Sequence, residues 1–243
     1  MKKQRVDYSG FSLRRLNEPR FAHIKLLAGW IVYFALYFLT ENLIPVERCH
    51  VIHWALDDWI PFNEYFTIFY VGWYLLVVAA LAYTLFYDVE SFKKLQCFIM
   101  ITQGLAMLCY IFYPSVQQLR PESFPRQNVF TWILGFLYTF DTPTGVCPSL
   151  HVSYSLGILS VTLKDRQLNR GVKAAVGLFV FMVCLSVCFI KQHSSLDVLA
   201  ALPVCLVAEI VLYGKDYWLP KLRKSSLSEN PSMPLSKKGE KNT

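Results

Sequence analysis

The chain has 243 residues, of which 54% are hydrophobic, 16% aromatic and only 17% charged, and its formal net charge is +7. A soluble globular protein has about 25% charged residues, so this composition excludes an ordinary soluble domain. Long uncharged runs alternate with short charged segments, a pattern typical of membrane-spanning helices. Such a topology explains the positive charge, together with attraction to anionic lipid headgroups, and nucleic acid is therefore not an expected partner.

The first half of the chain predicts three spans. Residues 1–20 form a basic segment, and the apolar run that follows is too long for a cleaved signal peptide and lacks a small-residue cleavage site. We expect spans at residues 24–44, 65–87 and 95–113, with a polar connection after the first span and a short charged turn, Asp88 to Lys94, after the second.

The second half predicts three more spans and one long connection. Within residues 114–148, the apolar stretch 128–140 is too short to cross a bilayer, so we interpret it as an interfacial helix or a lid. The fourth span, 149–163, is also short, and its start is expected to lie in protein rather than lipid. The fifth and sixth spans are expected at 172–190 and 193–213. These boundaries define an all-α, six-helix catalytic membrane domain, residues 21–214, and a polar tail, residues 215–243, that we expect to be disordered.

The distribution of Lys and Arg predicts the orientation. With six spans both termini lie on one side, and that side holds nearly all the loop cations, so the positive-inside rule makes it cytoplasmic. The opposite side has only Arg48, Arg120, Arg126 and Lys191. We therefore expect an integral plasma-membrane protein with cytoplasmic termini.

The seven cysteines show no metal-binding spacing. Five of them sit in apolar runs and are interpreted as small packing residues. Cys49 and Cys147 fall in connections on the same predicted side, where a disulfide between them is one option.

Several polar residues that suit phosphoryl chemistry converge on the non-cytoplasmic side. His193 and Asp197 are spaced i, i+4 at the start of the sixth span, so a helix places them on one face. A carboxylate beside one imidazole nitrogen fixes the tautomer and leaves the other nitrogen free to attack. The alternative is a helix-end pair that only stabilises packing.

The start of the fourth span and the preceding connection add three residues to this set. Ser149 and His151 open a helix after Pro148, and a helix N-terminus with a hydroxyl is suited to bind an anion. The alternative is a simple N-cap and an interfacial histidine. Arg120 suits phosphate because its planar guanidinium binds two oxygens at once, although an arginine in an exterior loop is often merely solvated.

Taken together, these segments resemble the three-part motif of the type-2 phosphatidate phosphatase superfamily, whose forms are Lys-x6-Arg-Pro, Pro-Ser-Gly-His and Ser-Arg-x5-His-x3-Asp. The resemblance covers about residues 113–201, and Pro-Ser-Leu-His-Val is most similar to the branch named for inositol phosphorylceramide synthase. The matching segments are Arg120-Pro121, Pro148-Ser149-x-His151, Ser186 and His193-x-x-x-Asp197.

The resemblance implies a phosphatidate phosphatase/haloperoxidase-like core and a role for each residue. His193 would be the nucleophile that forms a phosphohistidine, Asp197 would orient it, and His151 would be the general acid for the leaving group. Arg120 and Ser149 would hold the phosphate oxygens, and neither a metal nor a cofactor is implied.

Two motif cations are replaced. The first-motif lysine position is Tyr113 and the third-motif arginine position is Val187. Lys191 and Arg126 are candidates to supply the missing charge, Lys191 only if the sixth helix begins after it. The losses leave open a weaker phosphatase, a different phosphate geometry, or a transferase with altered headgroup recognition.

The sequence therefore predicts a membrane phosphatase acting on a lipid phosphate or diphosphate, of the phosphatidate or polyprenyl diphosphate type. A close alternative is a headgroup transferase that uses an alcohol in place of water. A non-catalytic lipid-binding or transport protein on the same scaffold is the third hypothesis. A purely structural membrane protein is disfavoured because ionisable groups near span ends are costly.

Overall fold

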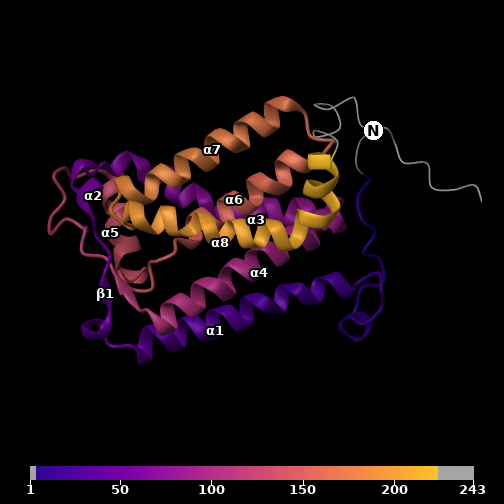
Figure 1. Cartoon of the computed structure of the whole chain (residues 1–243), viewed down its shortest axis with the longest axis horizontal. Helices are drawn as coiled ribbons and strands as arrows, with labels where there is room; N and C mark the ends of the chain where they lie inside the picture. Colours follow the sequence, from indigo (N-terminus) through magenta and orange to yellow (C-terminus); the bar gives the residue numbers. More distant parts are fainter. Residues whose placement is uncertain (1–3, 224–243) are drawn as a thin grey trace, which may run out of the picture.

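The computed structural model describes residues 4–223, which form a bundle of long helices running roughly along one axis (Figure 1). The elements are α1 (Ala28–Leu43), β1 (His50–Val51), α2 (Ala55–Trp59), α3 (Thr67–Tyr87), α4 (Val89–Phe112), β2 (Ser115–Val116), α5 (Val129–Phe140), α6 (Leu150–Lys164), α7 (Arg170–Phe189) and α8 (Ser195–Tyr213). Short 3-10 turns at Leu13–Arg15, Ala22–Leu27, Val46–Arg48 and Glu64–Phe66, and a π-helical turn at Gly214–Trp218, complete the set.

Side-chain caps set the starts of several helices. Asp88 accepts a hydrogen bond from Ser91 N at the start of α4, and Asn169 accepts one from Val172 N at the start of α7. Asn128 caps α5 by accepting from two backbone N–H groups. Such caps satisfy N–H groups that the helix itself leaves without partners.

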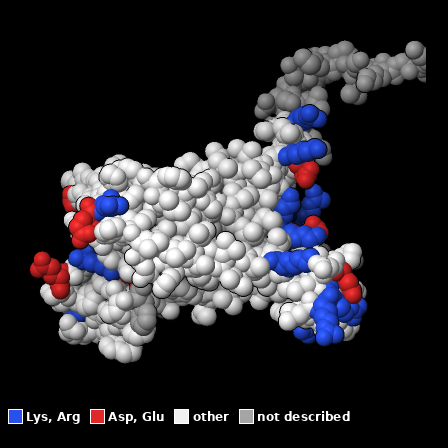
Figure 2. Space-filling model, turned by 90° about the horizontal axis from the view of Figure 1, so that it is seen from below, with Lys and Arg blue, Asp and Glu red and all other residues white. Residues whose placement is uncertain are grey.

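Five helical stretches are long and apolar enough to cross a membrane: Ala22–Leu43, Glu64–Tyr87, Val89–Phe112, Arg170–Phe189 and Ser195–Arg223. Figure 2 shows that Lys, Arg, Asp and Glu gather at the two ends of the molecule, with a broad uncharged band between them. The helical class is therefore confirmed, and the five apolar helices are compatible with an integral membrane protein. Helix α6 has 15 residues, about 22 Å of helix, and is not among the five, so a six-span topology stays a prediction.

Helix α6 lies inside the bundle, packed against α4, α7 and α8. Nine of its fifteen residues are buried, which identifies it as an internal helix rather than a lipid-facing one. Small residues allow this close packing: a Cβ on Gly157 would lie 2.6 Å from the Phe98 ring on α4. The expectation that this helix starts within protein is correct, because Ser149 is 0% exposed.

Two predicted boundaries were wrong. The charged segment Asp88 to Lys94 is not a turn, because α4 begins at Val89 and Glu90 pairs with Lys93 on its first turns. Helix also continues past Tyr213 to residue 223, where Trp218 Nε1 donates to Glu209 at 2.6 Å. The charged residues within 215–223 hid this continuation of the helix, and the rest of the predicted tail lies outside the described residues.

The connections at one end of the bundle form a compact cap. Here α2, α5 and β1 lie together (Figure 1), and we call this the site end and the opposite end the basic end. Strands β1 and β2 pair in parallel, and Ser115 on β2 accepts hydrogen bonds from Val146 N and Cys147 N. All seven cysteines lie within the described residues and are free thiols, so Cys49 and Cys147 do not form a disulfide.

Candidate active site

The structure brings His151, His193 and Asp197 together at the site end. His193 Nδ1 lies 3.1 Å from Asp197 Oδ2, and because the carboxylate can only accept, the imidazole proton sits on Nδ1. The Nε2 lone pair of His193 is then free. The rings of His193 and His151 lie edge to face with centroids 5.6 Å apart, which is close enough for one substrate group to contact both.

The loop before α8 holds His193 in this position. The backbone N–H groups of Gln192 and His193 both donate to Val187 O at 3.0 Å, and α8 begins only at Ser195, capped by Ser194. Lys191 adopts a positive φ of 58°, which turns the chain out of α7. The position of Val187, where the resembled motif has arginine, thus supports the site through its carbonyl while its side chain is fully buried.

Lys191 does not point into the site. Its ammonium donates to Asp57 O at 2.8 Å and to Ile60 O at 2.6 Å. Burial lowers the pKa of this ammonium from its usual value. The sixth helix does begin after Lys191, as the expectation required. The Lys191 side chain nevertheless binds backbone carbonyls of α2 and of the residue that follows it, and does not replace a missing motif cation.

Asp57 is the residue that the sequence reasoning missed. Its carboxylate accepts hydrogen bonds from Ser194 Oγ at 2.5 Å, Ser195 Oγ at 2.5 Å, Ser195 N at 2.8 Å and Trp54 N at 3.2 Å. Burial raises the pKa of Asp57, but the hydrogen bonds from Ser194 and Ser195 outweigh burial and hold the pKa below its usual value.

Asp57 therefore fixes the start of α8, which begins two residues after His193. Its partner Ser194 lies 137 positions further along the chain. It is a positioning residue and does not line the cavity described below. The sequence offered only one signal, an acidic residue in a connection on the same predicted side, and nothing in its spacing pointed to α8.

The start of α6 meets the start of α8 through the backbone. Ser149 N donates to Asp197 O at 3.1 Å. The His151 ring stacks on Tyr70, with centroids 4.5 Å apart, and lies 4.2 Å from the Trp73 ring. Ser149 Oγ and His151 Nε2 are buried without a hydrogen-bond partner, which is costly in a folded protein. Of the two residues, only His151 lines the cavity described below.

Arg120 does not contact either histidine directly, because the side chain of Gln192 lies between them. Its Nε and Nη2 donate to Gln192 Oε1 at 3.0 and 2.5 Å, its Nη1 donates to Tyr138 O at 3.2 Å, and Nη2 also donates to Asp141 O. Burial lowers the pKa of the guanidinium. Its donors are thus committed to protein oxygens, and it contacts the site through Gln192.

The other two candidate phosphate contacts lie elsewhere. Arg126 binds the fully buried Glu64 through two hydrogen bonds of 2.5 and 2.7 Å. Tyr113, at the first-motif lysine position, is 54% exposed and stacks on His50 with centroids 4.1 Å apart. Neither residue supplies the charge that the resembled motif carries.

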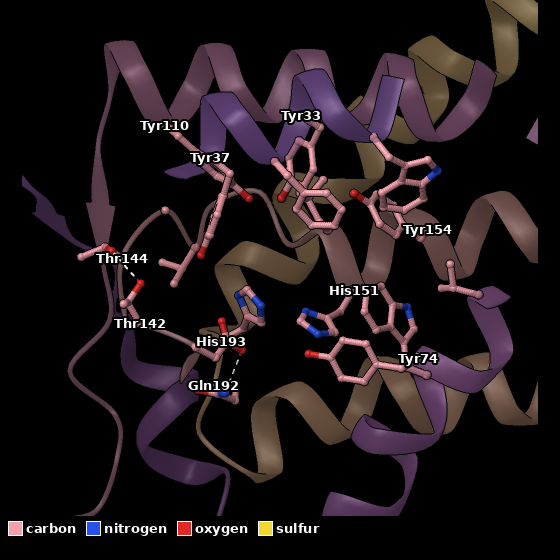
Figure 3. A pocket seen from close by; sticks show the side chains of 18 of the residues that line it. Tyr33, Tyr37, Tyr74, Tyr110, Thr142, Thr144, His151, Tyr154, Gln192 and His193 are labelled. Atoms are coloured by element: carbon pink, nitrogen blue, oxygen red, sulfur yellow. Dashed lines mark hydrogen bonds between the residues drawn. The ribbon is translucent and has the colours of Figure 1, made fainter. Parts of the chain in front are cut away.

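A cavity of about 440 Å³ opens beside the two histidines and passes between α1, α3, α4 and α6. Figure 3 shows His193 and His151 pointing toward one another into this space, with Tyr33 and Tyr37 of α1 on the facing wall. Its walls are strongly aromatic, and the rings that line it are Trp30, Tyr33, Phe34, Tyr37, Trp73, Tyr74, Tyr110 and Tyr154. Such a volume and lining suit an apolar ligand with a few polar contacts.

Among residues 4–223, no Lys or Arg side chain lines this cavity, and its one acidic lining residue is Asp141. In the same part of the chain, no three His, Cys, Asp or Glu side chains are grouped to hold a metal ion. Ser149 and Asp197 lie behind the histidines and do not line the cavity either.

Comparison of the chain with family models, with characterised proteins and with solved structures found no match in any of the three. The geometry of the site is therefore the evidence on which a function is proposed.

Proposed function

We propose that the protein is a membrane enzyme that transfers or hydrolyses a phosphoryl group of a lipid through a phosphohistidine on His193. The observation that carries this proposal is the pair of histidines at one cavity, of which only His193 is hydrogen-bonded to a buried carboxylate. A carboxylate-bound imidazole with a free Nε2 is a suitable nucleophile. The second imidazole, which has no partner, is suited to exchange a proton with the leaving group.

The reaction proceeds in two steps. Nε2 of His193 attacks phosphorus, the bond from phosphorus to the leaving oxygen breaks, and His151 donates a proton to that oxygen. In the second step water or an alcohol attacks the phosphohistidine, His151 takes the proton back, and His193 is released. Asp197 keeps the imidazole in the reactive tautomer and stabilises the positive charge that develops on the ring.

The lipid phosphatase is the first form of this proposal, with a phosphatidate or polyprenyl diphosphate as substrate. The apolar, aromatic lining of the cavity favours the second form, in which an acceptor alcohol replaces water and the enzyme transfers a phospho-headgroup. A non-catalytic lipid-binding protein is the remaining hypothesis. It is supported by the replaced cations at Tyr113 and Val187, and opposed by the His193–Asp197 pair, which lipid binding alone does not require.

The membrane setting of the proposal is a plasma membrane with both termini in the cytoplasm and the site on the outer face. The support is the charge asymmetry: Figure 2 shows more Lys and Arg at one end of the molecule than at the other. At this basic end the cations belong to the start of α4, the α6–α7 connection and the N-terminal segment. Cations of this kind are retained on the cytoplasmic side.

The experiment is an assay of phosphate release and of headgroup transfer on several lipid phosphates in detergent micelles containing EDTA. Wild-type protein is expected to be active and His193→Ala inactive. The matched control is His53→Ala, since His53 is exposed, hydrogen-bonds Asp58 at 2.8 Å and does not line the cavity. Activity that survives His193→Ala, or that strictly requires an added divalent metal, would overturn the mechanism.

A further inference from the structure

The cavity has two chemically different halves on either side of the histidines. Helix direction places one half deep in the bundle, toward the basic end, and the other at the site end. The deep half is lined by Trp30, Phe34, Val77, Val78 and Leu81, which suit an acyl or prenyl chain. The outer half is lined by Tyr37, Tyr110, Asp141, Thr142 and Thr144, which suit a polar group.

The outer half is negative. Asp141 lines it directly, and Glu41 lies immediately behind it, bound by Thr144 Oγ1 at 2.7 Å and by the hydroxyl of Thr142. Figure 3 places Thr142 and Thr144 together at this end of the cavity, on the His193 side. Within the described chain, neither carboxylate is ion-paired with a Lys or Arg side chain. Arg120 donates to the Asp141 carbonyl and offsets part of the negative charge, which leaves two carboxylates against one cation at this half.

The site end as a whole also carries a net negative charge. Its described segments carry eight carboxylates (Glu41, Glu47, Asp57, Asp58, Glu64, Glu122, Asp141 and Asp197) and four cations (Arg48, Arg120, Arg126 and Lys191). Three of those cations already donate to protein oxygens. A dianionic phosphate monoester would enter this end against the local field, with no free cation lining the cavity to receive it.

These observations select a different substrate, provided that the proposed phosphoryl chemistry holds. We propose that the outer half of the cavity binds the alkylammonium head group of a zwitterionic lipid phosphodiester, of the choline or ethanolamine kind. The carboxylates attract the ammonium, and the ring of Tyr37, which lines this half, offers it a cation–π contact. The head group carries its own positive charge, so the substrate is neutral overall and needs no cation from the protein.

In this arrangement the phosphorus lies at His193, between the two halves, and the lipid alcohol with its chains is the leaving group. The P–N bond to His193 forms, the P–O bond to the lipid alcohol breaks, and that oxygen takes the proton from His151. The phospho-alkylammonium on His193 then passes to water or to an acceptor hydroxyl, whose proton returns to His151. This outcome agrees with the deep half holding the apolar chains.

The test is a binding experiment that does not depend on turnover. Full-length His193→Ala protein in an uncharged maltoside detergent is titrated with dioctanoyl phosphatidylcholine, phosphatidylethanolamine, phosphatidylinositol and phosphatidate, and binding is followed by calorimetry. The ammonium lipids are expected to bind at least about tenfold more tightly than phosphatidate, the scale of one cation–π contact.

Further substitutions in the outer half of the cavity test where the head group binds. In the same background, Glu41→Gln and Tyr37→Leu should each reduce the preference for the ammonium lipids by about threefold or more, whereas Tyr37→Phe, which keeps the ring, should retain it. Glu47→Gln is the matched control, because Glu47 is an exposed carboxylate at the same end of the bundle and should leave the preference unchanged.

The outcomes separate this inference from the proposed function. Phosphatidate or phosphatidylinositol binding as tightly as the ammonium lipids overturns the head-group site, even if the wild type cleaves lipid phosphates through His193. Preferential binding of ammonium lipids by a wild type that cleaves no lipid leaves the head-group site standing and overturns the catalytic proposal.

Discussion

Replacing Asp57 by asparagine removes the buried charge on α2 that binds Ser194 and Ser195, directly after His193, without changing a residue of the cavity wall. Asp57 is 2% exposed, and four donors from Ser194, Ser195 and Trp54 converge on its carboxylate. A hydrogen bond to a charged group contributes about 1.5–3 kcal/mol, against about 1 kcal/mol for a neutral one. Asparagine also points an N–H at one of these donors, so we expect a loss of about 2–4 kcal/mol in stability.

The effect of Asp57→Asn on catalysis should appear in kcat rather than in KM, because the residue positions His193 and does not contact substrate. A tenfold loss corresponds to about 1.4 kcal/mol of misplacement energy, and we expect at least that. The assays are thermal unfolding in detergent and the lipid turnover measurement. Asp58→Asn is the matched control, since Asp58 is an exposed neighbour whose surface pair with His53 contributes about 0–1 kcal/mol.

The pH dependence gives a second measure of the same carboxylate. The folded-state pKa of Asp57 lies below its ordinary value of 3.8. The stabilisation from its ionised form is therefore complete above about pH 4 and is lost as the pH falls through the folded pKa. The difference in unfolding free energy between wild type and Asp57→Asn should therefore become smaller as the pH falls below about 4. An Asp57→Asn protein with the Tm and the kcat of Asp58→Asn would refute the positioning role.

Four further outcomes follow from the structure. Asp197→Asn should lower turnover by about 10²–10⁴-fold, measured at unchanged lipid binding, because the reactive imidazole tautomer is lost. Gly157→Ala should destabilise the fold by about 1–3 kcal/mol in denaturant or thermal unfolding, since its Cβ meets a buried ring at 2.6 Å, whereas Gly104→Ala on α4, with open space around it, should not. Arg126→Ala should lower the Tm by leaving Glu64 buried without its charged partner while KM for lipid is unchanged; a raised KM with a normal Tm would restore Arg126 as a phosphate contact. A reporter fused to the C-terminus should read cytoplasmic, and an external signal would invert the topology.

Helix content and the proximity of His193 to Asp197 could be predicted because they depend on local pattern. Uncharged runs locate the long helices, and the i, i+4 spacing of His193 and Asp197 already places them on one helical face. The contact between His151 and His193 followed only from the resemblance and the topology. These predictions agree with the structure because each rests on a short segment or on the direction of a helix.

The roles of the cations could not be predicted, because they depend on long-range hydrogen bonds. Arg120, Arg126 and Lys191 all lie on the expected side, yet each is bound to oxygens of a segment far away in the sequence. The sequence shows that a cation is present, but it does not show which oxygen accepts its hydrogen bonds in the folded protein. The same limit hid Asp57, whose partners are 137 and 138 positions away.

The central claim is that His193 forms a covalent bond to phosphorus during turnover. Wild-type protein is mixed with phosphatidylcholine and phosphatidate labelled at phosphorus, quenched with alkali, and the labelled peptide is identified. The label should be alkali-stable and acid-labile, located at His193, present in His53→Ala and absent from His193→Ala. A label that persists in His193→Ala, or undiminished turnover by that variant, would contradict the account.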